Sequence, residues 1–170
     1  ADNREYYTTY QMLEWEKDLL AKTQILSQRC SHFIAENKLE FIFASKTLNS
    51  EQKLAFKYIV EGQDLSLIVG FAGTGKSYLM DAVREAYESQ GYSVKGTALS
   101  GRAAENLLQG SSIKSHTIAR TLLDWEHDRE RMTNKSVLVL DEAGMVGTRQ
   151  WVALIKEAQQ VGAKVIVIGD

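Results

Sequence analysis

Strand-like and helix-like patterns of hydrophobic residues alternate along most of this chain. Strands are predicted where short segments are rich in apolar or β-branched residues, at 65–70, 93–98, 137–140 and 164–169. Apolar residues at spacings of three and four predict amphipathic helices near 49–61, 76–90, 101–109, 117–125 and 148–160. This alternation predicts an α/β fold, with a buried parallel sheet, right-handed crossovers and helices on both faces.

The N-terminal part follows a different pattern. Apolar residues at helical spacing predict a long helix over 10–33, with Ser27 and Ser31 as candidate break points. A threonine is available as its cap, and its aromatic and methionine side chains are expected to face the core. A run of apolar residues at 39–43 predicts a short strand. We therefore expect an N-terminal helical extension over residues 1–46, followed by an α/β domain over residues 47–170.

A glycine-rich loop separates the first predicted strand from the helix that follows. Residues 70–77 have the sequence GFAGTGKS, which fits the phosphate-binding pattern G-x-x-x-x-G-K-[ST], known as Walker A. Glycines leave the backbone bare, so that N–H groups at a helix start can wrap around phosphate oxygens. Lys76 would contact the β- and γ-phosphates, and Ser77 would give its hydroxyl to Mg²⁺. The expected nucleotide-binding residues of this loop are Gly73, Thr74, Gly75, Lys76, Ser77 and Tyr78.

The predicted strand at 137–140 ends in two acidic residues, Asp141 and Glu142, in the manner of a Walker B motif. A buried parallel strand would deliver them to its carboxyl edge, where open α/β sheets bind ligands. Asp141 would hold Mg²⁺, and Glu142 would polarise the water that attacks the γ-phosphate. Together with the Walker A loop, this pair predicts a P-loop NTPase that uses ATP and Mg²⁺, with Lys76 and Glu142 as catalytic residues.

Amino-acid composition gives limited information about the class of protein. The chain is 44% apolar and 25% charged, as expected for a globular core, and its net charge of −2 does not indicate nucleic-acid binding. The single cysteine, Cys30, excludes an internal disulfide and a cysteine-based zinc site. No apolar stretch approaches the roughly 20 residues that span a bilayer. No signal peptide is visible, and we expect a cytoplasmic location without a membrane partner.

Gln52 has two alternative roles. Asn49 and Gln52 have the spacing of a capping box at a helix start. The side-chain amide of Gln52 could instead read the N6/N7 edge of adenine, because it both donates and accepts hydrogen bonds. One glutamine side chain cannot easily serve both purposes.

A second helix start with small residues follows the strand predicted at 93–98. Ser100 and Gly101 lie where backbone N–H groups can hold a nucleic-acid phosphate, and Arg102 adds charge. His116 and Thr117 could contact the same nucleic-acid strand. The alternative for His116 is a polar loop residue that hydrogen bonds with its neighbours.

Six sequence blocks occur in a characteristic order: LNSEQ, VGFAGTGKS, GTALSGRAAENL, SHTIAR, VLVLDEAGMV and VIVIGD. Over about residues 48–170 they resemble superfamily 1 DNA helicases, in particular the RecD-like helicase part of TraA-type (MobF) conjugative-transfer relaxase-helicases. The resemblance implies a RecA-like first motor domain that couples ATP hydrolysis to movement along single-stranded DNA. It also implies a longer polypeptide with a second motor domain and a relaxase domain, consistent with a chain that starts with Ala1.

The resemblance implies a role for each candidate residue. Gln52 would contact adenine, and the Walker residues would bind phosphate and Mg²⁺. Single-stranded DNA would be contacted from around 100–102 and 115–117. The family usually has Ala-Pro-Thr where this chain has Ala-Leu-Ser at 98–100. A far-domain arginine contributes about 10³–10⁵ in rate in related NTPases, so we expect these residues alone to bind Mg·ATP and hydrolyse it slowly without unwinding DNA.

Two other classes remain open. A different P-loop enzyme, such as an AAA-type ATPase, shares both Walker motifs, whereas a P-loop kinase would carry an arginine-rich lid that is not visible here. A P-loop module that binds DNA or a partner without turnover would not need the intact acidic pair. Nucleotide binding separates an enzyme from such a module.

Overall fold

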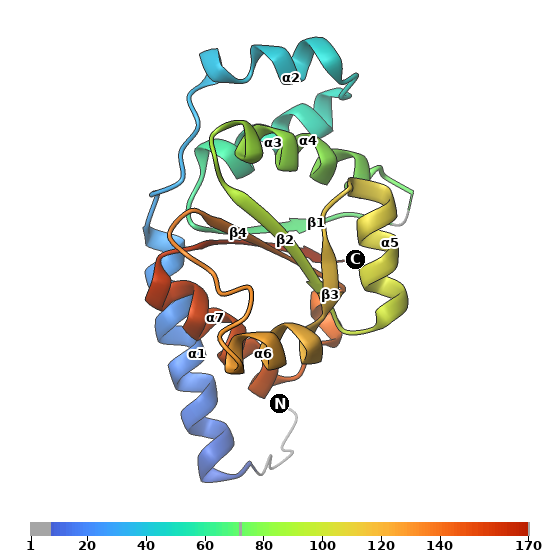
Figure 1. The fold of residues 1–170 in the computed structure, drawn as a ribbon. Coiled ribbons are helices and arrows are strands. Elements are labelled where there is room, and N and C mark those ends of the chain that lie inside the picture. The colour runs from blue at the N-terminus through green and yellow to red at the C-terminus, as the bar shows by residue number, and fades with distance from the viewer. Residues whose placement is uncertain (1–7, 72, 170) are drawn as a thin grey trace, which may run out of the picture.

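The computed structural model describes residues 8–71 and 73–169 and is built around a five-stranded parallel sheet (Figure 1). Its strands are β1 (Leu65–Val69), β2 (Ser93–Ala98), β3 (Ser115–Thr117), β4 (Ser136–Asp141) and β5 (Lys164–Gly169). Their spatial order is β1-β5-β4-β2-β3, and every neighbouring pair is parallel. The predicted α/β class with a parallel sheet is confirmed. The short strand β3 is an addition that the sequence did not indicate.

Helices cover both faces of the sheet, as predicted. They are α1 (Tyr10–Gln28), α2 (Glu40–Ser45), α3 (Ser50–Glu61), α4 (Lys76–Ser89), α5 (Gly101–Ser111), α6 (Ile118–Glu126) and α7 (Thr148–Val161). Short 3₁₀ turns lie at Glu36–Lys38 and Ala143–Met145. In Figure 1, α2, α3 and α4 lie above the sheet, while α1, α6 and α7 lie below it.

The central strands are apolar on both faces because each face has its own helix layer. In β4, Val137 and Val139 belong to the apolar cluster that includes α3 and α4. The alternate residues Leu138 and Leu140 pack with α6 and α7. Burial on both sides explains why this strand is an uninterrupted apolar run, and it fixes the direction in which Asp141 leaves the sheet.

The strand that precedes the phosphate loop is less buried than predicted. Within residues 8–71 and 73–169, β1 pairs only with β5, so it forms one edge of the sheet. Leu67 is 57% exposed and Val69 is 78% exposed. The expectation of a strand was correct, but the expectation of burial was wrong, because the order of strands decides which of them lies at an edge.

Residues 39–43 form a helix start and not the predicted strand. Leu39 occupies the N-cap position of α2, and Leu39 and Ile42 are buried in the same cluster as α3 and α4, with Phe43 packed against it. These positions have the spacing of one helix face. The aromatic and β-branched composition favoured a strand, but packing against the helix layer overrides this local preference.

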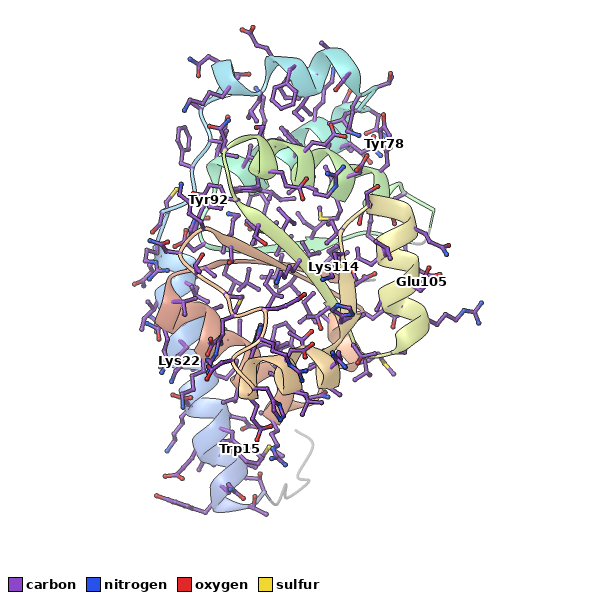
Figure 2. The ribbon with its side chains drawn as sticks, viewed as in Figure 1. Trp15, Lys22, Tyr78, Tyr92, Glu105 and Lys114 are labelled. Atoms are coloured by element: carbon purple, nitrogen blue, oxygen red, sulfur yellow. The ribbon has the colours of Figure 1, made fainter. Side chains whose placement is uncertain are left out.

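Helix α1 begins where it was expected and ends next to Ser27, the first of the two candidate break points. The side chain of Thr9 caps it by accepting a hydrogen bond from the Met12 backbone N–H at 3.1 Å, and the helix ends at Gln28. It packs along α7, and Leu26 is its one fully buried residue. Met12 and Trp15 are half-buried, so the expectation that these side chains face the core is met only in part. Trp15 lies on the part of α1 that extends below the sheet layers (Figure 2).

A buried ion network ties the segment after α1 to the start of the sheet. Asp64 is fully buried and accepts hydrogen bonds from Arg29 Nε at 2.7 Å and from the Ser31 backbone N–H at 2.8 Å. Lys164 is also fully buried, and its Nζ donates to the Gln63 carbonyl at 2.5 Å. Burial lowers the pKa of Lys164 to about 8, although the Asp64 carboxylate acts in the opposite direction.

The buried lysine predicts a pH-dependent stability. Because its pKa falls from 10.5 in the unfolded chain to about 8 in the folded chain, the unfolded state binds more protons between these values. The Lys164 contribution to stability should therefore rise as pH increases through this window. We expect the stability of Lys164→Met relative to the parent to fall by about 1–3 kcal/mol between pH 7 and pH 10.5, because only the parent gains stability in this window. Urea unfolding at several pH values measures this, and a constant difference would contradict it.

Candidate nucleotide site

The two Walker segments meet at the carboxyl edge of the sheet. One cavity of about 860 Å³ is lined by Gly73, Gly75, Lys76, Ser77, Asp141 and Glu142, together with Phe71, Gly144, Met145 and Gly169. Its size is within the range of small-molecule sites. The nucleotide hypothesis requires this arrangement, because the phosphates and their cation must reach both segments.

Left-handed backbone at two glycines shapes the loop. Gly73 and Gly75 both have a φ of 81°, which other residues adopt only under strain. Gly75 is the N-cap of α4, so the helix begins at Lys76. The first N–H groups of a helix have no acceptor within the helix, and here they lie at the cavity. Ala72, in the same loop, lies outside the described residues.

The ammonium of Lys76 lies on the loop itself. Its Nζ donates to the Gly70 carbonyl and, at 3.3 Å, to the Phe71 carbonyl. These neutral acceptors hold the charge at the wall of the cavity. Phosphate oxygens would be stronger, charged acceptors for the same group.

Glu142 has a strained backbone. Its φ is 55°, in the left-handed region that costs a non-glycine residue about 1–2 kcal/mol. Its backbone N–H donates to Asp141 Oδ1 at 2.9 Å, and its side chain is exposed at the cavity. Strain of this kind concentrates at functional sites, where it fixes the direction of a side chain. Nothing in the sequence indicated this conformation.

The donor set fits magnesium. Mg²⁺ takes one or two protein oxygens and completes its shell with phosphates and waters. Ser77 and Asp141 would supply a hydroxyl and a carboxylate from opposite segments of the cavity. Across residues 8–71 and 73–169 there is no group of three or more His, Cys, Asp or Glu side chains suited to a metal ion. A cation here would thus depend on the nucleotide as well as on the chain.

Gln52 takes part in the capping box and also reaches the phosphate loop. Its backbone N–H donates to Asn49 Oδ1 at 2.8 Å, and the Asn49 backbone N–H donates to Gln52 Oε1 at 3.0 Å. The remaining amide group, Nε2, donates to the Thr74 carbonyl at 3.4 Å. The amide nitrogen is therefore the part of Gln52 that faces the nucleotide loop, while its oxygen is used at the helix start.

Substitution by glutamate separates the two roles of Gln52. Gln52→Glu keeps an acceptor for the capping box but removes the N–H donor. We expect it to weaken ATP binding about 2- to 10-fold, which corresponds to one hydrogen bond, and to leave the melting temperature nearly unchanged. Gln52→Ala should also lose about 1 kcal/mol of stability with the cap. If Gln52→Glu and the parent bind ATP with equal affinity, the role of Gln52 is restricted to capping α3.

Tyr78 is not brought into the cavity. Its hydroxyl accepts a hydrogen bond from the Thr47 backbone N–H at 3.2 Å, and its ring lies 5.5 Å from Lys46 Nζ. Figure 2 shows Tyr78 beside the upper helix layer. Conversely, Phe71 and Met145 line the cavity and are 84% and 74% exposed, although the sequence did not single them out. Their signal would have been an apolar residue inside the Walker A motif and another shortly after the acidic pair.

Most candidate DNA contacts lie together at neighbouring strand ends. Ser100 caps α5 by accepting a hydrogen bond from the Ala103 backbone N–H at 3.1 Å, and Gly101 and Arg102 are exposed in its first turn. Thr117 ends β3, pairs in register with Ala98 of β2, and caps α6. The structure therefore places these residues at the same edge of the sheet as Asp141, which pairs with Ala98 from the other side.

His116 lies in β3 and not in a loop. It is half-buried and lines a small pocket with Lys95, Lys114 and Glu130. Glu130 bridges the two lysines at 2.6 Å and 3.2 Å, and these hydrogen bonds lower the pKa of Glu130 to about 2. Lys114 is labelled in Figure 2. Residues of α6 also line this pocket. His116 therefore shares a pocket with the charged side chains of Lys95, Lys114 and Glu130, and it does not line the nucleotide cavity.

No helix in the described ranges, 8–71 and 73–169, has the length and apolar character needed to cross a bilayer.

Known proteins resemble this chain over nearly all of its length. A probable conjugal transfer protein TraA from Sinorhizobium fredii is 38% identical over 165 residues, which is 96% of this chain and 15% of that protein. Another TraA, from Agrobacterium fabrum, is 36% identical over the same shares. The ATP-dependent RecD2 DNA helicase of Deinococcus radiodurans is 30% identical over 131 residues, 75% of this chain and 18% of the helicase. The chain thus spans less than a fifth of the length of each of these relatives.

The match to a protein family covers the part of the chain that holds the cavity. The model of an AAA domain family matches residues 47–170, from just before the capping box to the end of the last strand. The TraA and RecD2 relatives confirm the expected resemblance to RecD-like helicase motor domains. With its Walker residues gathered at one sheet edge, the chain belongs to this AAA domain family of nucleotide-binding P-loop proteins.

Proposed function

We propose that this chain is the ATP-binding first motor unit of a DNA helicase that acts in conjugative DNA transfer. The observation that carries the proposal is the cavity shared by Lys76, Ser77, Asp141 and Glu142. The relatives support the rest, since one is named a conjugal transfer protein and another is named an ATP-dependent DNA helicase. In the whole protein, hydrolysis in this cavity would drive movement along single-stranded DNA.

Each residue of the cavity has a distinct task in this proposal. Backbone N–H groups of the loop and the Lys76 ammonium bind the triphosphate. Ser77 and Asp141 hold Mg²⁺, which neutralises phosphate charge when it is bound. Glu142 orients the attacking water and accepts its proton. The strained backbone of Glu142 holds that carboxylate at the cavity.

The proposed DNA contacts share a sheet edge with the nucleotide site. β2 pairs with both β3 and β4, so Ser100, Gly101, Arg102 and Thr117 lie near the end of β4. His116 and Thr117 are half-buried, whereas the other three residues are exposed. We propose residues 47–170 as the motor domain and residues 1–46 as an extension, a division that the family match from residue 47 supports. A second motor domain, a relaxase domain and a cytoplasmic location complete the proposal for the whole protein.

Substitution of Lys76 tests the nucleotide site. Lys76→Ala should weaken ATP binding by at least about 30-fold, because removing one partner of a charged hydrogen bond costs about 2–5 kcal/mol. Titration with a fluorescent ATP analogue in the presence of Mg²⁺ measures the affinity.

Lys156→Ala is the matched control for Lys76→Ala. Lys156 is an exposed lysine of α7 that does not line the cavity. Its removal should leave the affinity unchanged. Equal affinities for Lys76→Ala and the parent chain would refute the Walker A assignment.

Another kind of AAA-type ATPase is the second candidate, and the name of the matching family favours it. Binding of single-stranded oligonucleotides distinguishes the two. A helicase motor should bind them with an affinity that falls steeply as salt increases, because phosphate contacts release counterions. A P-loop module without turnover would bind nucleotide or DNA but show no hydrolysis in the presence of either.

A further inference from the structure

Gly110, near the end of α5, lies directly against the candidate Mg²⁺ ligand Ser77. Figure 1 shows α5 running from the end of β2 towards the start of α4. A Cβ atom at residue 110 would lie 2.6 Å from Ser77 Cβ and 2.9 Å from Ser77 Oγ. Non-bonded carbon atoms are most stable at about 3.5–4.0 Å. Any side chain at this position would therefore displace either Ser77 or α5.

Hydrogen bonds hold this end of α5 in place. Arg84 of α4 donates from Nε to the Ser111 carbonyl at 3.1 Å. Ser111 is fully buried, and its Oγ donates to the Leu107 carbonyl at 2.5 Å. Because α5 is anchored to α4 next to the contact, a new side chain at Gly110 would move Ser77 more readily than the helix.

Helix propensity makes the glycine at 110 conspicuous. Glycine inside a helix is less favourable than alanine by about 0.5–1 kcal/mol. Gly110 lies within α5 and needs no left-handed backbone, because it is not among the glycines with positive φ. The close approach of Ser77 is the feature of the surroundings that explains why a residue without a side chain occurs here.

We propose that Gly110 is a positioning residue that sets the place of the Ser77 hydroxyl and so controls Mg²⁺-dependent nucleotide binding without touching the nucleotide. The inference rests on the proposed function, since it takes Ser77 as a Mg²⁺ ligand. A glycine with a merely structural role would change stability and leave the magnesium dependence of binding as it was. The other end of the same helix carries the candidate DNA contacts Ser100 and Arg102.

The test compares nucleotide affinity with and without magnesium. In Gly110→Ala, a fluorescent ATP analogue should bind at least about tenfold more weakly than in the parent when Mg²⁺ is present. In EDTA the two affinities should agree within about twofold, because the loop N–H groups and Lys76 are unaffected. Gln109→Ala, an exposed neighbour on the same helix, is the control and should match the parent in both conditions. Full Mg²⁺-dependent affinity in Gly110→Ala would overturn the inference.

A double-mutant cycle assigns the effect to Ser77. When Ser77→Ala has already removed the hydroxyl, Gly110→Ala should cause no further loss of Mg²⁺-dependent affinity. An equal loss in both backgrounds would show that Gly110 acts on something else.

Folding of the variant has its own check. If Gly110→Ala does not fold, the double variant Ser77→Gly/Gly110→Ala should fold, because it lacks the Ser77 side-chain atoms that the new methyl group would contact. A double variant that also fails to fold would overturn the inference. The proposed function fails separately, in the parent chain, if that chain binds the analogue in neither condition.

Discussion

Glu142→Gln should bind ATP as the parent does and hydrolyse it about 10²- to 10⁴-fold more slowly. Glutamine keeps the size of the side chain and can still hydrogen bond to a water molecule, but it cannot accept the proton of that water. Its backbone must adopt the same left-handed conformation, with a φ near 55°. Single-turnover hydrolysis with protein in excess of ATP measures the rate even where turnover is slow, and a binding titration checks the affinity.

Glu126→Gln provides the control for this substitution. Glu126 is an exposed acid at the end of α6 and does not line the nucleotide cavity. Its neutralisation should leave both binding and hydrolysis unchanged. If Glu142→Gln hydrolyses ATP as fast as the parent, another group must accept the proton of the attacking water. Glu142 would then have only a positioning role.

Asp64→Ala should destabilise the fold by about 3–5 kcal/mol, the usual effect of removing one partner of a buried ion pair. The change leaves the buried Lys164 ammonium and the Arg29 guanidinium without their carboxylate, and it removes the acceptor of the Ser31 N–H. Because these contacts join the segment after α1 to the sheet, we expect that segment to detach first. Urea unfolding gives the total loss, and amide exchange at residues 29–34 shows whether it is local.

An exposed ion pair is the comparison for Asp64. Glu36→Ala removes the partner of Lys57 at the surface, where the acid is 64% exposed and the lysine is 41% exposed. Solvent screens such pairs, so the loss should stay below about 1 kcal/mol. A loss of similar size for both variants would mean that the Asp64 network contributes no more than a surface pair.

Local chemistry explains what the sequence predicted well. The glycine pattern before Lys76, the capping box of Asn49 and Gln52, and the acidic pair after 137–140 each lie within a few residues of chain. Their meaning depends on short-range sterics and hydrogen bonds, which nearby residues determine almost alone. The alternation of strands and helices likewise favoured a parallel sheet, because crossover connections between parallel strands are usually helices.

Contacts between distant segments decided the rest. The exposed position of Val69, the helical form of residues 39–43 and the existence of β3 follow from which elements pack together, and hydrophobic periodicity does not contain that information. The contacts within the nucleotide cavity also join segments that are far apart in sequence, so periodicity does not predict them.

The amino-acid sequence by itself determined the class of fold, the phosphate loop and the acidic pair, because these depend on neighbours along the chain. Only the tertiary structure brought Asp141 to the cavity of Lys76, gave Glu142 its left-handed backbone and placed Gly110 against Ser77. These arrangements join residues that are remote in sequence, and only packing in three dimensions sets the distance between them.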